Sequence, residues 1–272
     1  MVESAAKSSS GKTQRVATGQ PPVIVDRGPL SPDFAPPDGV ELDDHQRRQL
    51  GRLRDLLLGW NERVNLTAIK DPAGVEQWLF LDALRMAPEI RAALPEGRTA
   101  SLIDIGTGAG FPGLPLAIAM PEVDFTLLDA TNKKVAFIST VVAELGLTNV
   151  QPLHGRAEEI GQDFRHRARY DLATARAVAT LPALFELAAP LLRVNGRAFF
   201  PKSAAIETEL DEAERAATIL GVRILSTNDL PHRTDEQVTR LVIMDKLAVT
   251  PMRFPRRAGL PAKEPLGKAK AS

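Results

Sequence analysis

Residues 103–113 read IDIGTGAGFPG, a short apolar run that contains an acid and is followed by four glycines within eight residues. Gly106, Gly108 and Gly110 form one spacing, whereas Gly108, Gly110 and Gly113 form the G-x-G-x-x-G spacing of dinucleotide-binding folds. At a turn from strand to helix, glycines let the backbone approach a ligand, and the start of the helix presents unpaired N–H groups. The loop therefore predicts a nucleoside cofactor, which is either a dinucleotide or S-adenosylmethionine.

From Ser101 onward, short apolar runs alternate with helical stretches, which is typical of a parallel sheet with crossover helices. The expected strands cover residues 101–105, 124–129, 150–153, 170–175, 196–201, 222–226 and 238–244, and helices are expected to begin near residues 111, 132, 156, 181 and 203. Only residues 228–237 separate the last two strands, which is too short for a helical crossover, so these strands should pair antiparallel. The pattern predicts an α/β fold with a seven-stranded doubly wound sheet whose last strand is antiparallel. This order resembles the Rossmann-like class I methyltransferases rather than the nicotinamide enzymes.

Helical periodicity precedes the sheet. Apolar residues at helical spacing predict an amphipathic helix that starts near Asp43, and these residues are Leu50, Leu53, Leu57, Trp60 and Val64. Asp71 is a suitable N-cap and Pro72 suits the first helical position, so a second helix is expected to run as far as Pro88. We expect a disordered tail over residues 1–40, a helical region over 41–98, a methyltransferase domain over 99–250 and a basic tail over 251–272.

The composition excludes several kinds of chemistry. The chain has no cysteine, which removes disulfides, thiolate metal sites and cysteine nucleophiles. Its four histidines are scattered without metal-ligand spacing, so no metal site is expected. The first 20 residues lack a signal-peptide core and no apolar run is long enough to span a membrane, so we expect a cytoplasmic protein without a membrane partner.

The charge is balanced overall, with 34 basic and 34 acidic residues, but it is uneven along the chain. Seven basic residues and one acid, Glu264, follow from Lys246 onward. The balanced total argues against nonspecific coating of nucleic acid, whereas the basic end favours a local contact with phosphates.

Acids at the ends of the first two strands favour one cofactor. Asp104 would repel a pyrophosphate, whereas it suits a sulfonium cofactor with an ammonium group nearby. Asp129 lies 23 residues after Gly106, where an acid accepts ribose hydroxyls in either cofactor family, although it also suits an N-cap of the next helix. Ala157 and Glu158 follow the third strand, where they suit contacts with an adenine ring, although Glu158 also suits a first-turn helix acid.

Arg176 follows the fourth strand. Enzymes that methylate exocyclic amines commonly place an acid or amide, two prolines and an aromatic residue at this edge, whereas this chain has Thr174, Ala175 and Arg176. A cation here suits a phosphate, a carboxylate or the acceptor edge of a guanine.

The motifs together resemble the ribosomal RNA small subunit methyltransferase G family, also called glucose-inhibited division protein B, over residues 42–266. The resemblance rests on WNERVNLTAI (60–69), DIGTGAGFPGLPLAI (104–118), LLDATNKKVAFI (127–138), GRAEE (155–159), ARAVATLPALFELAAPLL (175–192) and the closing RFPRRAGLPAKEPLG (253–267). It implies methyl transfer from S-adenosylmethionine to N7 of a guanine in the decoding-region loop of bacterial 16S rRNA. The partner implied is the 16S rRNA, the small ribosomal subunit or its assembly intermediate, and we expect a monomer.

Cofactor contacts follow from the loop and from the resemblance, and they are Gly106, Gly108, Phe111, Asp129, Ala130, Thr131, Ala157, Glu158 and Arg176; the resemblance alone supplies Phe111, Ala130 and Thr131. The chain departs from the family at Trp78 and Leu79, where an Arg-His pair is usual, and at Ser203, where Lys202 is usually followed by glycine.

Guanine N7 has a lone pair and no proton, so no catalytic base is assigned. Substrate RNA is expected to contact Lys202, Arg253, Arg256 and Arg257, with Phe254 stacking on a base, although a solvated tail is the alternative. The other functions considered are a small-molecule methyltransferase, a nicotinamide oxidoreductase and a noncatalytic RNA-binding module.

Overall fold

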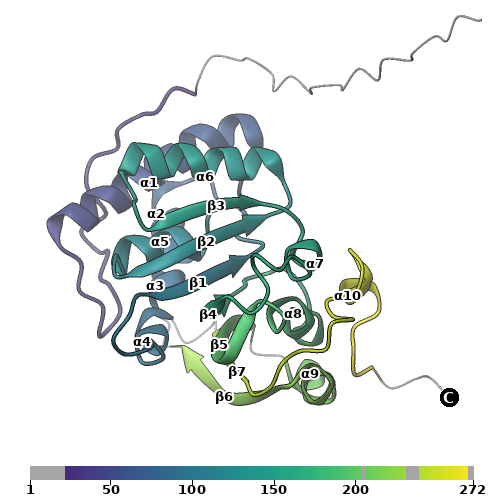
Figure 1. Ribbon diagram of the computed structural model, residues 1–272. Coiled ribbons are helices and arrows are strands. Elements are labelled where there is room, and N and C mark those ends of the chain that lie inside the picture. Colours follow the sequence, from purple (N-terminus) through teal and green to yellow (C-terminus); the bar gives the residue numbers. More distant parts are fainter. Residues whose placement is uncertain (1–21, 204–205, 231–238, 269–272) are drawn as a thin grey trace, which may run out of the picture.

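Seven strands form one sheet in the computed structural model, which describes residues 22–203, 206–230 and 239–268 (Figure 1). The strands are β1 (Ala100–Ile105), β2 (Val123–Asp129), β3 (Val150–His154), β4 (Tyr170–Thr174), β5 (Leu192–Ser203), β6 (Val222–Leu230) and β7 (Thr239–Lys246). Their order is β3-β2-β1-β4-β5-β7-β6, and β7 is antiparallel to both of its neighbours. The predicted doubly wound sheet with an antiparallel last strand is confirmed.

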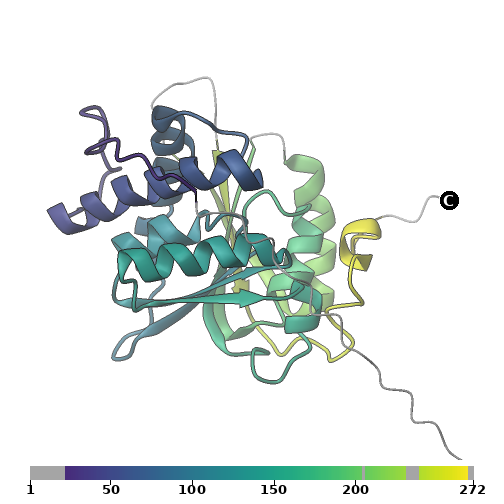
Figure 2. The ribbon, with the colours of Figure 1, turned by 90° about the horizontal axis from the view of Figure 1, so that it is seen from above.

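Helices cover both faces of this sheet (Figure 2). The crossover helices are α5 (Gly113–Ala119), α6 (Asn132–Leu145), α7 (Ala157–Ile160), α8 (Leu181–Ala188) and α9 (Glu207–Leu220). Neighbouring residues of one strand enter different hydrophobic clusters: Leu102 joins the cluster under α5 and α6, while Ile103 joins the cluster under α8 and α9. Because successive side chains of a strand point to opposite faces, buried strands of this kind need an apolar residue at nearly every position.

The predicted first helix is α1 (Asp44–Val64), and its start is fixed by a capping box. Asp43 accepts a hydrogen bond from the Gln46 backbone, and the Gln46 side chain accepts one from the Asp43 backbone. The leucines at positions 50, 53 and 57 are fully buried in the cluster shared with α5 and α6. The helical region is therefore packed directly on the sheet domain.

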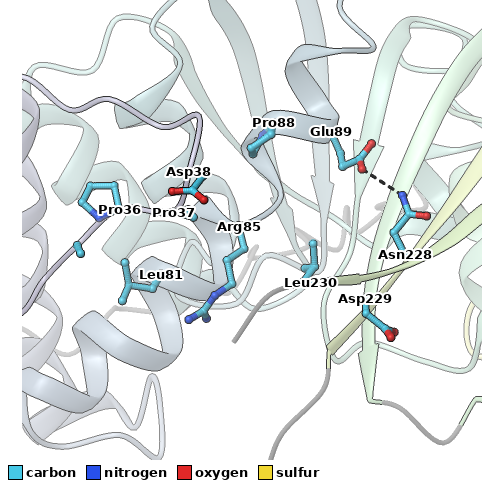
Figure 3. A pocket seen from close by; sticks show the side chains of 11 residues that line it. Pro36, Pro37, Asp38, Leu81, Arg85, Pro88, Glu89, Asn228, Asp229 and Leu230 are labelled. Atoms are coloured by element: carbon cyan, nitrogen blue, oxygen red, sulfur yellow. Dashed lines mark hydrogen bonds between the residues drawn. The ribbon is translucent and has the colours of Figure 1, made fainter. Parts of the chain in front are cut away.

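The second helical stretch starts as expected but ends earlier. It comprises α2 (Pro72–Val75), the π-helix η1 (Glu76–Leu81) and α3 (Asp82–Leu84), with Asp71 as N-cap. The prediction that it ends at Pro88 is wrong, because Pro88, labelled in Figure 3, lies in the first turn of α4 (Ala87–Arg91). A proline is tolerated in a first turn because its missing N–H has no partner there.

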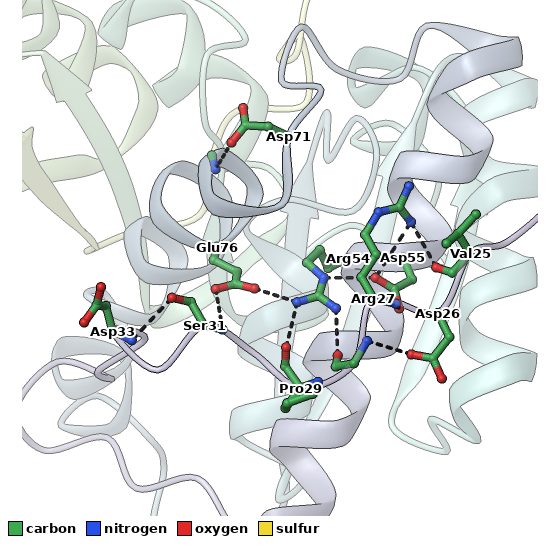
Figure 4. A network of polar contacts seen from close by, with 12 residues as sticks. Val25, Asp26, Arg27, Pro29, Ser31, Asp33, Arg54, Asp55, Asp71 and Glu76 are labelled. Carbon is green, nitrogen blue, oxygen red and sulfur yellow. Dashed lines mark hydrogen bonds and ion pairs between the residues drawn. The ribbon is translucent and has the colours of Figure 1, made fainter.

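The segment before α1 is ordered against the helices. Leu30, Phe34 and Val40 are buried in the first hydrophobic cluster. Arg54 of α1 donates to the carbonyls of Gly28 and Pro29, as part of the polar network in Figure 4. The expectation of a disordered tail over residues 1–40 is therefore wrong for residues 22–40, while residues 1–21 lie outside the described residues.

The segment after β7 also folds back onto the domain. It contains α10 (Leu260–Lys263), lies beside α8 and α9 in Figure 1, and buries Phe254 in the second cluster. Arg167 holds the start of this segment by donating to the carbonyls of Thr250, Pro251 and Phe254. The alternative of a solvated tail is therefore wrong for residues 251–268, which pack on the domain, and residues 269–272 of the predicted basic tail lie outside the described residues.

Candidate functional site

The glycine loop joins β1 to α5 at the carboxyl edge of the sheet. Gly106, Gly108 and Gly110 have φ of 66°, 64° and 92°, a region that side-chain-bearing residues rarely adopt. A Cβ added to Gly106 would lie 2.7 Å from a methyl group of Val178, so the segment after β4 lies close over the loop. The backbone at Gly106 and Gly108, two predicted cofactor contacts, therefore depends on glycine.

Asp104 supports the loop from inside the sheet. Its Oδ2 accepts hydrogen bonds from Thr107 Oγ1 at 2.6 Å and from the Gly113 amide at 2.9 Å. Its Oδ1 is buried and has no hydrogen-bond partner within the described residues. Burial raises the pKa of Asp104 to about 6, although its two hydrogen bonds and the charge of Arg176 act in the opposite direction. A buried acceptor without a partner is costly, so a cationic ligand group at Oδ1 would stabilise the site.

Asp129 ends β2 beside the same loop. It accepts hydrogen bonds from the Gly108 amide at 2.9 Å and from the Thr131 amide at 2.8 Å, and its Oδ2 lies 3.8 Å from the Lys134 ammonium. An ionised carboxylate has about four acceptor positions, so acceptor capacity remains for two hydroxyl groups. The alternative that Asp129 is the N-cap of the following helix is wrong, because Thr131 occupies that position.

The neighbouring predicted contacts lie along the same edge. Ala130 is exposed, and its carbonyl lies 3.1 Å from His154 Nε2. Ala157 begins α7 and is buried, while Glu158 Oε1 accepts a hydrogen bond from the Gly259 amide at 2.7 Å. The C-terminal segment therefore reaches the place where an adenine contact is predicted, a contact between distant segments that the sequence did not indicate.

Arg176 follows β4 and is held by the helical region. Its Nη1 donates to the Trp78 carbonyl at 3.1 Å and lies 4.0 Å from Asp82 Oδ2. Burial lowers the pKa of the guanidinium, while Asp82 and Asp104 favour its charged form. The sequence did not predict that Arg176 contacts the Trp78 carbonyl and Asp82, because the helical region showed only an amphipathic pattern and gave no sign of which residues it would contact.

Phe111 packs its ring on the helical region. The ring is buried and stacks on Phe80 of η1, with centroids 6.1 Å apart. Phe111 therefore joins the loop to η1, and its contact with a cofactor stays a prediction.

Two of the four basic side chains predicted to bind RNA form ion pairs with acids of the same chain. Lys202 donates to the Ala179 carbonyl at 3.1 Å and pairs with Glu209 at 2.8 Å. Arg256 makes a bidentate pair with Glu186, whose side chain is 0% exposed. The donors of both cations are directed at the protein itself, which argues against their contacting phosphates.

Arg253 and Arg257 differ from these two, because both are exposed and neither forms an ion pair within the described chain. Arg253 lies over the ring of Phe254, 5.0 Å from its centroid. The prediction that Phe254 stacks on a base is wrong, since only 4% of this residue is exposed.

Over the described residues, no group of three His, Asp or Glu side chains is arranged to hold a metal ion. None of the helices in the same residues is both long and apolar enough to cross a bilayer.

Three features define a class I methyltransferase fold. They are the doubly wound sheet with an antiparallel last strand, the glycine loop after β1 and the carboxylate at the end of β2. The family model described as "rRNA small subunit methyltransferase G" matches residues 46–239, and the chain belongs to this family.

Curated relatives agree with the family match over nearly their whole length. The protein named ribosomal RNA small subunit methyltransferase G of Chloroflexus aggregans is 44% identical over 228 residues, which cover 84% of this chain and 93% of the relative. The proteins of the same name from Alkaliphilus metalliredigens and Lactococcus lactis subsp. cremoris are 40% and 41% identical, and each alignment covers 84% of this chain and 94% of the relative.

Proposed function

We propose that the protein transfers a methyl group from S-adenosylmethionine to N7 of a specific guanine in 16S rRNA of the small ribosomal subunit. The observation that carries the cofactor assignment is the pair of carboxylates at the glycine loop, Asp104 and Asp129, each with an acceptor position left open. Family membership supports the rRNA acceptor.

The residues present fit this cofactor. Asp104 Oδ1, buried and without a partner in the described chain, suits the ammonium group of the methionine part. Asp129 has room for the ribose hydroxyls, and the loop backbone is open at Gly108, where an added Cβ would meet only the Lys134 ammonium, at 4.0 Å. The further contacts proposed for the cofactor are Phe111, Ala130, Thr131, Ala157, Glu158 and Arg176.

S-adenosylmethionine supplies an electrophilic methyl group on a sulfonium centre when it is bound. The chain's own task is to hold the acceptor nitrogen in line with that group, because N7 of guanine has a lone pair and needs no base. Orientation of this kind supplies on the order of 7–11 kcal/mol of a barrier. No residue is therefore assigned as a general base.

Arg176 is proposed to orient the acceptor. The methylated ring gains positive charge, so the guanidinium should contact guanine O6 or a phosphate rather than N7. Its anchoring by the Trp78 carbonyl and Asp82 fixes its position at the mouth of the site.

The substrate is proposed to be 16S rRNA, the small subunit or its assembly intermediate, met in the cytoplasm by a monomeric enzyme. Arg253 and Arg257 are proposed as phosphate contacts, because they are the members of the predicted set whose donors remain exposed.

The test is a transfer assay with labelled S-adenosylmethionine and three acceptors: small subunits lacking the modification, naked 16S rRNA, and an extract of small metabolites. We expect label in RNA, and the stronger of the two RNA forms identifies the substrate. Label only in small metabolites would contradict the proposal and indicate a small-molecule methyltransferase. The Asp129→Ala variant serves as the cofactor-site control, in which transfer to every acceptor should fall.

A further inference from the structure

Trp78 is an exposed aromatic residue at the mouth of the proposed site. It lies on η1, is 38% exposed, and its own carbonyl accepts the hydrogen bond from Arg176. The second tryptophan, Trp60, is partly buried and packs on Phe137 of α6, with ring centroids 5.9 Å apart. The exposed part of the Trp78 indole can stack on a planar ligand group at this edge.

Trp78 is one of the residues that line a cavity of about 790 Å³, which is within the usual range for ligand sites. The N-terminal segment contributes Ser31, Asp33 and Phe34 to its lining, and the rest comes from residues 68–71, 73–74, 76–78 and Leu81. Figure 4 shows Ser31, Asp33, Asp71 and Glu76 of this lining. We name this cavity the Trp78 pocket.

Two of the three acids that line the Trp78 pocket, Asp71 and Glu76, accept hydrogen bonds from other groups of the protein. Asp71 accepts from the Gly74 amide at 2.7 Å as the cap of α2. Glu76 is buried and accepts from Arg54 at 2.8 Å and from the Ser31 amide at 3.0 Å. Asp33 is exposed and also takes part in an interaction within the protein. The negative charge of Glu76 is therefore balanced inside the wall, and the Asp71 carboxylate is turned toward its own helix.

Two hydrogen-bond donors of the Trp78 pocket remain open. The Lys70 ammonium and the Gln77 side-chain amide have no hydrogen-bond or ion-pair partner within the described part of the chain. An indole face, an amide and an ammonium form the combination that binds a nucleotide: the ring stacks on the base, the amide meets its polar edge, and the cation meets a phosphate.

We propose that the Trp78 pocket binds an unpaired base of the substrate RNA that neighbours the methylated guanine. This inference rests on the proposed function, because it takes the acceptor at Arg176 to be RNA. Arg176, which is proposed to orient the acceptor, donates a hydrogen bond to the carbonyl of Trp78, a residue that lines the pocket, so a nucleotide adjacent to the acceptor is within reach of the pocket. Stacking tolerates any base, so the pocket orients the strand and does not read its sequence.

Fluorescence gives a direct readout of this contact. The chain has two tryptophans, so Trp60→Phe leaves Trp78 as the sole indole. Titrating this variant with a single-stranded RNA of the target loop should quench the remaining emission and shift its maximum. An unchanged spectrum at RNA concentrations that saturate binding would overturn the proposal.

Steady-state kinetics give the second readout. Trp78→Ala should raise the KM for the RNA substrate about 5- to 100-fold, with kcat and cofactor affinity unchanged, and Trp78→Phe should restore most of the loss. Phe164→Ala is the matched control, because Phe164 is 79% exposed in the loop before the amino end of β4 and should leave KM unchanged.

The two hypotheses fail in different ways. If the wild-type protein methylates no RNA, the proposed function fails and the RNA-base assignment fails with it. If the wild type methylates RNA while Trp78→Ala retains the normal KM and melting temperature, only the Trp78 pocket assignment fails. A pocket that binds a protein partner would give this second result.

Discussion

The glycine loop edge and the C-terminal segment both carry charges that the sequence indicated as functional, yet the structure uses these charges differently. At the loop edge, Asp104 and Asp129 bind backbone amides and still have acceptor positions open. In the C-terminal segment, Arg256 directs its guanidinium at Glu186 and at the Glu264 carbonyl. A charged residue is therefore a ligand contact only if its hydrogen-bonding capacity exceeds what the fold itself requires.

The largest expected effect is on stability, at Arg256. Arg256→Ala should lower the free energy of unfolding by about 3–5 kcal/mol, because it removes the guanidinium from the fully buried Glu186 carboxylate and leaves only the backbone amide of residue 256 as a donor there. Urea denaturation measures this loss, and the exposed Arg257→Ala variant should change stability by less than about 0.5 kcal/mol. Equal stabilities of the two variants would contradict the assignment of Arg256 as a structural residue and Arg257 as an exposed one.

The next effect concerns the cofactor, at Asp129. Asp129→Ala removes the acceptor of the Gly108 and Thr131 amides and the proposed partner of the ribose. We expect S-adenosylmethionine to bind about 100-fold more weakly in titration calorimetry, since hydrogen bonds to charged groups contribute about 1.5–3 kcal/mol each. Asp124→Ala, an exposed position near the start of the same strand, is the control and should bind normally. Normal binding by Asp129→Ala would show that the carboxylate only shapes the loop.

The loop edge also predicts a pH dependence. The pKa of Asp104 is raised to about 6, so the carboxylate is charged above that pH and neutral below it. The α-amino group of the cofactor stays charged between pH 7 and 5, and affinity should therefore fall about tenfold over this range as the carboxylate gains a proton. The Asp104→Asn variant should bind S-adenosylmethionine weakly, with an affinity that does not change between pH 7 and 5. A wild-type profile that is flat from pH 7 to 5 would contradict the assigned role of Oδ1.

The smallest effect is expected at the exposed arginines of the C-terminal segment. Arg253→Ala and Arg257→Ala should each reduce the salt dependence of RNA binding by about one unit of slope and weaken binding severalfold. Lys202→Ala should leave the slope unchanged, because Lys202 is paired with Glu209. An equal reduction in slope for all three variants would indicate that the ion pair opens to bind phosphate.

Much of the fold follows from local sequence patterns. The glycine loop, the strand periodicity and the Asp71 cap each depend on neighbouring residues, and all three appear where expected. The short link between the last two strands was sufficient to predict that they pair antiparallel.

The remaining features depend on contacts between distant residues. Glu186 and Arg256 are 70 positions apart, and only the fold brings the acid beneath the basic segment. Leu30, Phe34 and Val40 lie among prolines without a regular period, so their burial against the helical region had no sequence signal. The hydrogen bond from Arg176 to the Trp78 carbonyl had no sequence signal either, because every residue has a backbone carbonyl whatever its side chain.

The most direct test of the account is to map the methylated atom. After reaction with S-adenosylmethionine, the RNA of unmodified small subunits would be cleaved at 7-methylguanine and the cleavage sites read by primer extension. The account predicts one new cleavage at a single guanine of the 16S rRNA, much weaker with Asp129→Ala at the same cofactor concentration. Methyl incorporation without cleavage, or cleavage at many guanines, would contradict a site that positions one guanine N7.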